Sequence, residues 1–236
     1  MKRICSLWKK YFNLFLEFFS YVGDQEKKMG KTFDWQMSEL EKKGIPAVIL
    51  EKLKKKKRSV VFYACHQVYY PNYFEMIDFF PVIPFSVLKE KFDFPLFSIN
   101  QEDGCLMNIC ESIDTDKIYN NSGPETNEPY FVFGAESGLN ENSISGVSPR
   151  SALRIFEKVQ IKPMNLTEAL SFLMLYGNLY NGNGEKISVL DSRYRKDSFV
   201  PEFSRSRKGF KLLDDLLDSN DRKKVYPAIL QRHFYS

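Results

Sequence analysis

Helix-like and strand-like segments alternate along this chain without the regular spacing of strand–helix–strand repeats, and this irregularity limits the possible fold most strongly. Strand-like apolar runs occupy residues 59–65, 80–85, 130–135 and 187–190. Helical patterns occupy 32–43 and segments starting near 47, 149 and 166, and two more, about 209–217 and 222–233, close the chain. The sequence therefore predicts an α+β fold, in which a small mixed sheet packs with helices and an amphipathic helix precedes them.

Two of the predicted helices begin with clear capping signals. Ser148 precedes Pro149, which is the usual order of an N-cap and a first-turn proline. Asn165 and Glu168 have the spacing of a capping box, in which each side chain binds the backbone N–H of the other residue. We therefore expect helices to start at Pro149 and Leu166.

Residues 4–22, ICSLWKKYFNLFLEFFSYV, have the polar period of an amphipathic helix. Charges at Lys9, Lys10 and Glu17 interrupt the apolar run, so it fits neither a signal peptide nor a spanning helix. Its wide apolar face predicts docking on its own domain or a second copy, binding to a partner, or burial in a membrane interface. We expect residues 1–31 to form this helix and a linker, and 32–236 a single α+β domain.

The charge is distributed unevenly along the chain. The whole sequence has a net charge of +4. Residues 1–58 carry an excess of eight positive charges, whereas the remainder has an excess of four negative charges. An excess of positive charge in the N-terminal segment favours an anionic partner such as a membrane surface or nucleic acid. Nucleic acid is the less expected partner, because the basic run 54–58 also fits a helix C-terminus, where the helix dipole favours cations.

The four cysteines are too few for a disulfide scaffold in a chain of 236 residues, which favours reduced thiols and a cytoplasmic protein, with a membrane-peripheral location as the alternative. A zinc site built from Cys65, His66, Cys105 and Cys110 would lack the usual CxxC spacing. The sequence also contains no phosphate-binding glycine loop, HExxH or GxSxG motif. We therefore expect no metal and no cofactor.

Residues 187–211, ISVLDSRYRKDSFVPEFSRSRKGFK, have the highest density of charge, with seven basic and three acidic residues. The pattern predicts a strand over 187–190 followed by a charged loop, and polar loops at strand ends commonly hold binding sites. The candidate ligand-binding residues come from this segment and from the helix that starts at 166: Asp191, Ser192, Arg193, Arg195, Asp197, Arg205 and Glu168.

Two interpretations of this cluster follow from the chemistry of arginine. In the first, Arg193 clamps an anionic small molecule or an acidic peptide, because a guanidinium matches carboxylate and phosphate. In the second, Arg193 binds Asp191, Asp197 or Glu168 and holds the loop on the helix. An enzyme of unknown class is a further possibility, using Ser192, Arg193 and Asp197 with Glu168 or His66 as the base.

Three segments together resemble a bacterial family known as domain of unknown function 5701: FDWQMSELEKKGIPA (33–47), PYFVF…PRSALRIF…KPMNLTEALSFL (129–173) and LDSRYRKDSFVPEF (190–203). The first matches the family's FxxQxxxLxxKG helix, the second its PLTxxEG helix start and the third its GSR…D…VP segment. The resemblance covers about 33–214 and implies a bacterial protein. Ala169 and Asp191 replace two of the family's glycines. The family has no established activity, so the resemblance implies no catalytic residue.

Overall fold

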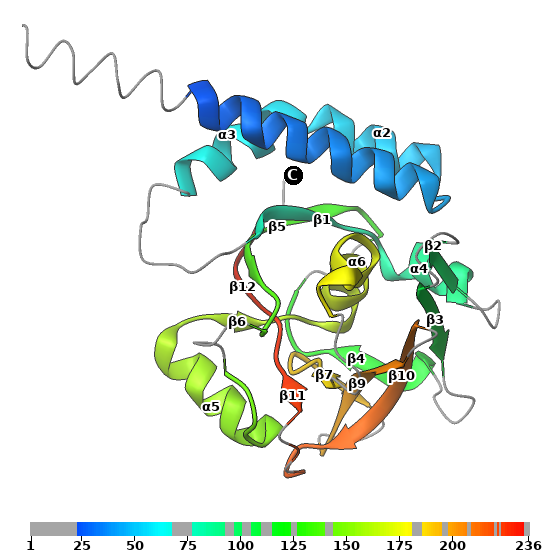
Figure 1. The fold of residues 1–236 in the computed structure, drawn as a ribbon, viewed down its shortest axis with the longest axis vertical. Helices are drawn as coiled ribbons and strands as arrows, with labels where there is room; N and C mark the ends of the chain where they lie inside the picture. Colours follow the sequence, from blue (N-terminus) through cyan, green and yellow to red (C-terminus); the bar gives the residue numbers. More distant parts are fainter. Residues whose placement is uncertain are drawn as a thin grey trace, which may run out of the picture.

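A computed structural model describes residues 23–67, 77–92, 97–100, 105–109, 115–123, 127–139, 144–180, 186–194, 198–206, 209–219, 221 and 223–233. The amphipathic segment 4–22 lies outside these residues. The architecture is α+β, as the sequence predicts: helices pack with small antiparallel and mixed sheets (Figure 1).

Helices form the first layer of the fold. A helix over residues 23–42 is followed by α2 (Ala47–Lys55) and α3 (Lys57–Gln67). The predicted linker over 23–31 is therefore wrong, because the helix already includes it and Met29 is fully buried. The predicted strand over 59–65 is also wrong. Its Val60, Val61 and Ala64 lie on one buried face of α3, so helical packing overrides their strand propensity.

The first sheet lies beneath this helical layer and has the strand order β1-β5-β12-β6. All its pairings are antiparallel. The strands are β1 (Ile77–Val82), β5 (Tyr130–Glu136), β12 (Ala228–His233) and β6 (Lys162–Pro163). β5 and the extended start of the predicted 80–85 segment are confirmed. The predicted helix over 222–233 is wrong, because β12 pairs with β5 and forms the middle of this sheet.

The second sheet is mixed, with the order β11-β7-β9-β10-β3-β2. β10 is parallel to β3, and β11 is parallel to β7. The strands are β2 (Phe97–Asn100), β3 (Cys105–Ile109), β7 (Lys186–Ser188), β9 (Phe199–Ser206), β10 (Gly209–Leu216) and β11 (Lys224–Val225). A separate pair joins β4 (Ile118–Asn120) to β8 (Ser192–Tyr194).

The predicted charged loop after residue 190 is largely strand, because β8, β9 and β10 follow one another there. β9 and β10 form an antiparallel hairpin along their full length. The predicted helix over 209–217 is thus wrong as well. Its apolar residues Phe210 and Leu212 are buried at the strand period of two.

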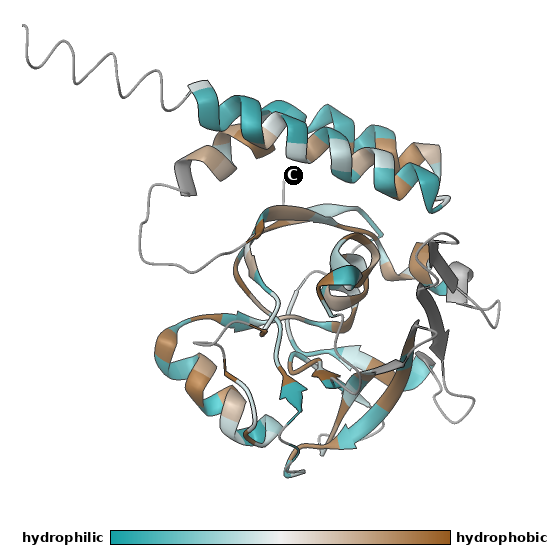
Figure 2. Ribbon diagram, viewed as in Figure 1, coloured by the Kyte–Doolittle hydropathy of each residue, from teal (hydrophilic) through white to brown (hydrophobic). Residues whose placement is uncertain are grey.

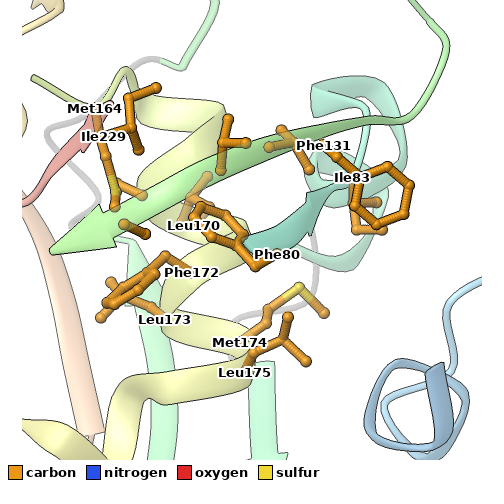
Figure 3. Close-up of a cluster of buried hydrophobic side chains, with 14 of the residues drawn as sticks. Phe80, Ile83, Phe131, Met164, Leu170, Phe172, Leu173, Met174, Leu175 and Ile229 are labelled. Atoms are coloured by element: carbon orange, nitrogen blue, oxygen red, sulfur yellow. The ribbon is translucent and has the colours of Figure 1, made fainter. Parts of the chain in front are cut away.

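The helix α6 (Leu166–Tyr176) lies between the two sheets (Figure 1). Residues 166–175 are all buried, which explains why its sequence is apolar on every side. Figure 3 shows Leu170, Phe172 and Leu173 of this helix beside Phe80 of β1. The main hydrophobic core therefore surrounds α6.

Smaller helices complete the structure. α4 (Phe85–Phe92) follows β1, and short 3-10 helices lie at Thr115–Lys117 and Gly177–Leu179. α5 (Pro149–Val159) covers a second, smaller core with Ala152 and Phe156. Its predicted start is confirmed, since the Ser148 side chain accepts a hydrogen bond from the Ser151 N–H.

Candidate functional site

The capping box at the start of α6 places Glu168 in the interior. Asn165 Oδ1 accepts a hydrogen bond from Glu168 N at 2.9 Å, and a Glu168 carboxylate oxygen accepts one from Asn165 N at 2.9 Å. The box is therefore present as the sequence predicts. Glu168 has no exposed surface, and a buried carboxylate needs a cation or several hydrogen bonds.

Arg232 of β12 supplies the cation. Its Nε donates to Glu168 Oε1 at 2.5 Å, and its Nη2 donates to Glu168 Oε2 at 2.9 Å. The same Nη2 donates to Asp191 Oδ2 at 2.7 Å, and Nη1 donates to Ser122 Oγ at 2.7 Å. The guanidinium thus joins β12, α6 and the segment before β8. We name this group, Glu168, Asp191, Arg232 and Ser122, the Arg232 cluster.

Asp191 belongs to the same cluster. The Ser122 hydroxyl donates to its carboxylate, and Tyr130 in β5 donates to Glu168 Oε1 at 3.0 Å. Burial raises the pKa of Asp191, and the contacts with Ser122 and Arg232 oppose that rise. Two carboxylates thus share one guanidinium in the interior, a demanding arrangement because each ion has lost its water.

Ser192 has partners that fit a structural role. Its hydroxyl accepts a hydrogen bond from Leu166 N at 2.8 Å and donates to Asn120 Oδ1 at 2.5 Å. A nucleophilic serine needs a base as its hydrogen-bond acceptor, and an amide oxygen is a very poor base. These contacts instead attach β8 to the first turn of α6 and to β4.

Arg193 does not bind the two carboxylates of the cluster in the way that the internal-network interpretation expects. Its Nη1 donates to the carbonyl oxygens of Leu190 at 2.7 Å and Ser192 at 2.8 Å. A buried network of this kind exists around Arg232, while Asp197, the third partner expected for Arg193, lies outside the described residues. Sequence reasoning missed Arg232 because it assigned residues 222–233 to a helix, which separated Arg232 from β5 and α6.

The remaining sequence candidates are not brought into the cluster by any described contact. Arg195 and Asp197 lie outside the described residues. Arg205 lies in β9 and His66 in α3, but their side chains are not described. Cys65 is a free thiol, and Cys105 begins β3. Cys110 lies outside the described residues. Within the described part of the chain, no group of three or more His, Cys, Asp or Glu residues could hold a metal ion.

A hollow of about 510 Å³ lies along β4 and the turn before it. Asp116, Lys117, Ile118 and Tyr119 line it. Tyr119 stands opposite Arg193 in the β4–β8 pair, and directly opposed residues of an antiparallel pair share one face. Lys89 of α4 forms an ion pair with Asp116. One cation, Lys117, and the aromatic Tyr119 thus line this hollow, and Arg193 lies on the same face of the strand pair as Tyr119.

A second buried charge cluster lies in the mixed sheet. Lys224 of β11 forms ion pairs with Asp215 and, at 3.9 Å, with Glu202. Both Lys224 and Glu202 are almost fully buried. Burial, reinforced by the charge of Asp215, raises the pKa of Glu202 to about 7. Sequence reasoning missed this cluster, because its members are spread over three strands that pair only in the folded sheet.

Comparison with known proteins does not assign this site to a family. No family model, no curated protein and no solved structure matches the chain. Among the helices of the described residues, none is long and apolar enough to cross a bilayer. The function therefore has to be argued from the side chains themselves.

Proposed function

We propose that this chain is a binding module for an anionic small molecule or an acidic peptide side chain, held in the hollow beside β4 and β8. The single observation that supports the proposal is the opposed pair Tyr119 and Arg193 beside a hollow of about 510 Å³. Lys117 lines the same hollow and adds positive charge. A guanidinium, an ammonium and an aromatic face together suit a carboxylate or phosphate attached to a small organic group.

The backbone contacts of Arg193 support this proposal. Because its Nη1 donates to Leu190 O and Ser192 O, the guanidinium is oriented before a ligand arrives. A pre-oriented side chain loses less rotamer freedom on binding, so more of the contact energy contributes to affinity. Just before Arg193 in the chain, Arg232 binds Asp191, and Ser192 is held by its contacts with Leu166 N and Asn120 Oδ1.

The proposed setting is the cytoplasm of a bacterium: the few cysteines favour the cytoplasm, and the resemblance to the domain of unknown function 5701 family implies a bacterial source. The residues of the first quoted segment have clear structural uses in this fold. Gln36 Nε2 donates to Phe79 O at 2.7 Å and Gly44 ends the helix with φ +71°, while Phe33 and Leu40 are buried. Such positions tie a helix to a sheet and need no catalytic explanation.

Thermal unfolding in the presence of small anions tests the proposal. Phosphate, a nucleoside monophosphate and a dicarboxylic acid are each added at 1 mM. A ligand with a dissociation constant of ~10 μM should add roughly 2.7 kcal/mol to the free energy of unfolding at that concentration. We expect at least one of the three to raise the melting temperature.

Two substitutions then locate the site. Arg193→Gln and Lys117→Gln each remove a charged donor, so we expect about 10-fold weaker binding or more for each variant. Lys158→Gln, at an exposed position of α5, is the matched control and should leave the affinity unchanged. If all three anions leave the melting temperature unchanged, or if Lys158→Gln weakens binding as much as Arg193→Gln, the hollow is not an anion site.

A further inference from the structure

The junction of α2 and α3 concentrates positive charge on the helical layer. Residues 52–58 contain six Lys or Arg residues and no acid. The cations in the last turn of α2 are favourable there, but α3 begins at Lys57 and has no acidic residue in its first turn. Lys57 and Arg58 thus lie at the positive end of the α3 dipole, which disfavours cations. Helix stability alone does not explain this placement.

Only part of this charge is neutralised within the protein. Lys52 pairs with Glu128 at 2.6 Å, Lys54 with Glu51 at 3.5 Å and Lys57 with Asp34 at 2.6 Å. Lys55 and Arg58 are exposed, and neither forms an ion pair with any residue that the structure describes. Two cations at this junction are therefore directed to the solvent.

A large apolar side chain lies next to them. Phe62 is 72 % exposed, more than any other large apolar residue among those described. It follows Arg58 by four residues, which places both on one face of α3. Its neighbours Val60, Val61 and Ala64 are buried against the sheet. In Figure 2, α3 is largely brown, whereas the helix over 23–42 beside it is largely teal.

We propose that three exposed residues, Arg58 and Phe62 of α3 and Lys55 at the end of α2, together called the α3 face, dock on an anionic phospholipid membrane surface. The cations would meet lipid phosphates and carboxylates, while Phe62 would enter the boundary between headgroups and acyl chains. An exposed apolar side chain near two exposed cations suits a membrane interface, which accepts both kinds of group. Residues 4–22, just before the helical layer, combine aromatic residues with Lys9 and Lys10 and have the same chemistry in sequence.

Co-sedimentation of the full chain with lipid vesicles tests this inference. One set contains phosphatidylcholine with 30 % phosphatidylserine, and the other contains phosphatidylcholine alone. We expect binding to the anionic vesicles only. Phe62→Ser should weaken that binding about 10-fold, as expected from the loss of one large apolar contact. The double variant Lys55→Glu, Arg58→Glu should weaken it by 10-fold or more.

Matched controls separate this face from general effects. Leu216→Ser removes an apolar side chain that is 50 % exposed on β10, and Lys158→Glu with Lys162→Glu reverses two exposed charges. Both control variants should bind like the unmodified chain. The inference is overturned if the full chain does not pellet with anionic vesicles, or if Phe62→Ser and the charge reversal both leave binding intact. It is also overturned if the face binds a single-stranded RNA oligonucleotide and no vesicle.

Discussion

At the scale of single residues, the sequence analysis considered two roles for Arg193: binding an anionic ligand and binding internal carboxylates. In the structure, the second role belongs to Arg232 for Glu168 and Asp191. Arg193 contacts backbone carbonyls beside an open hollow, whereas Arg232 is enclosed by Glu168 and Asp191. The sequence could single out Glu168, Asp191 and Ser192 as candidates, because a capping box and a charged segment are local patterns. It could not predict Arg232, whose position depends on pairing between strands almost 100 residues apart.

Removing Arg232 should be strongly destabilising. Arg232→Met would leave the buried Glu168 carboxylate without its cation, and breaking a buried ion pair from one side costs about 3–5 kcal/mol. Urea denaturation should show that loss in the free energy of unfolding. The control is Arg150→Met, whose ion pair with Asp218 is exposed and screened by solvent, so that this variant should lose far less stability. Equal losses in the two variants would contradict the role assigned to Arg232.

Glu202 should make stability depend on pH near neutrality. Burial raises its pKa from 4.5 to about 7 in the folded state, so folding favours the protonated acid. That contribution is fully present below pH 4.5 and is lost as the pH rises through 7. Between pH 5 and 8 its loss should lower the free energy of unfolding by about 2–3 kcal/mol.

The variant Glu202→Gln isolates this effect, since glutamine has nearly the same shape and does not titrate. The difference between the unmodified chain and the variant, measured by urea denaturation at several pH values, should therefore change across this range. Lys186, Lys224 and Asp215 also face Glu202 and are present in both proteins. A constant difference from pH 5 to 8 would show that Glu202 does not titrate there.

At the scale of elements, local signals predicted best where they did not depend on distant strands. Ser148, Asn165 and Glu168 fix their helix starts through contacts within one turn, so α5 and α6 begin as expected. The errors lie where tertiary packing, and not the local sequence, decided between the helical and the strand spacing of apolar residues. Residues 59–65 became part of α3 because one face covers β1 and β5, and 209–217 became β10 because β3 and β9 flank it.

Because the helical layer packs on the first sheet, substitutions of its buried and its exposed phenylalanine should change the free energy of unfolding by very different amounts. Phe33, 1 % exposed, packs on Phe131 with the ring centroids 6.0 Å apart, so Phe33→Ala should cost about 3–5 kcal/mol. Phe62→Ala, at a position that is 72 % exposed, should change the free energy of unfolding by less than about 0.5 kcal/mol. Thermal or urea unfolding of both variants checks this, and a large loss for Phe62→Ala would mean that its side chain is covered.

At the scale of the whole molecule, the helical layer, the first sheet and the mixed sheet are arranged around one buried helix, α6. The helical layer and the first sheet cover one side of α6, and the mixed sheet covers the other (Figure 1). The proposed ligand hollow and the α3 face belong to different parts of this arrangement. The proposed membrane docking through α3 and the proposed anion binding beside β4 therefore involve separate side chains, and substitutions can remove each without the other.

The place of β12 in the first sheet has a consequence for synthesis. This strand lies between β5 and β6, yet it is the last strand of the described chain, and it carries the arginine that neutralises Glu168. Until residues 228–233 leave the ribosome, β5 has an open edge and the start of α6 holds an uncompensated acid. The emerging chain therefore keeps this sheet edge exposed to chaperones until residues 228–233 have been made and have paired with β5.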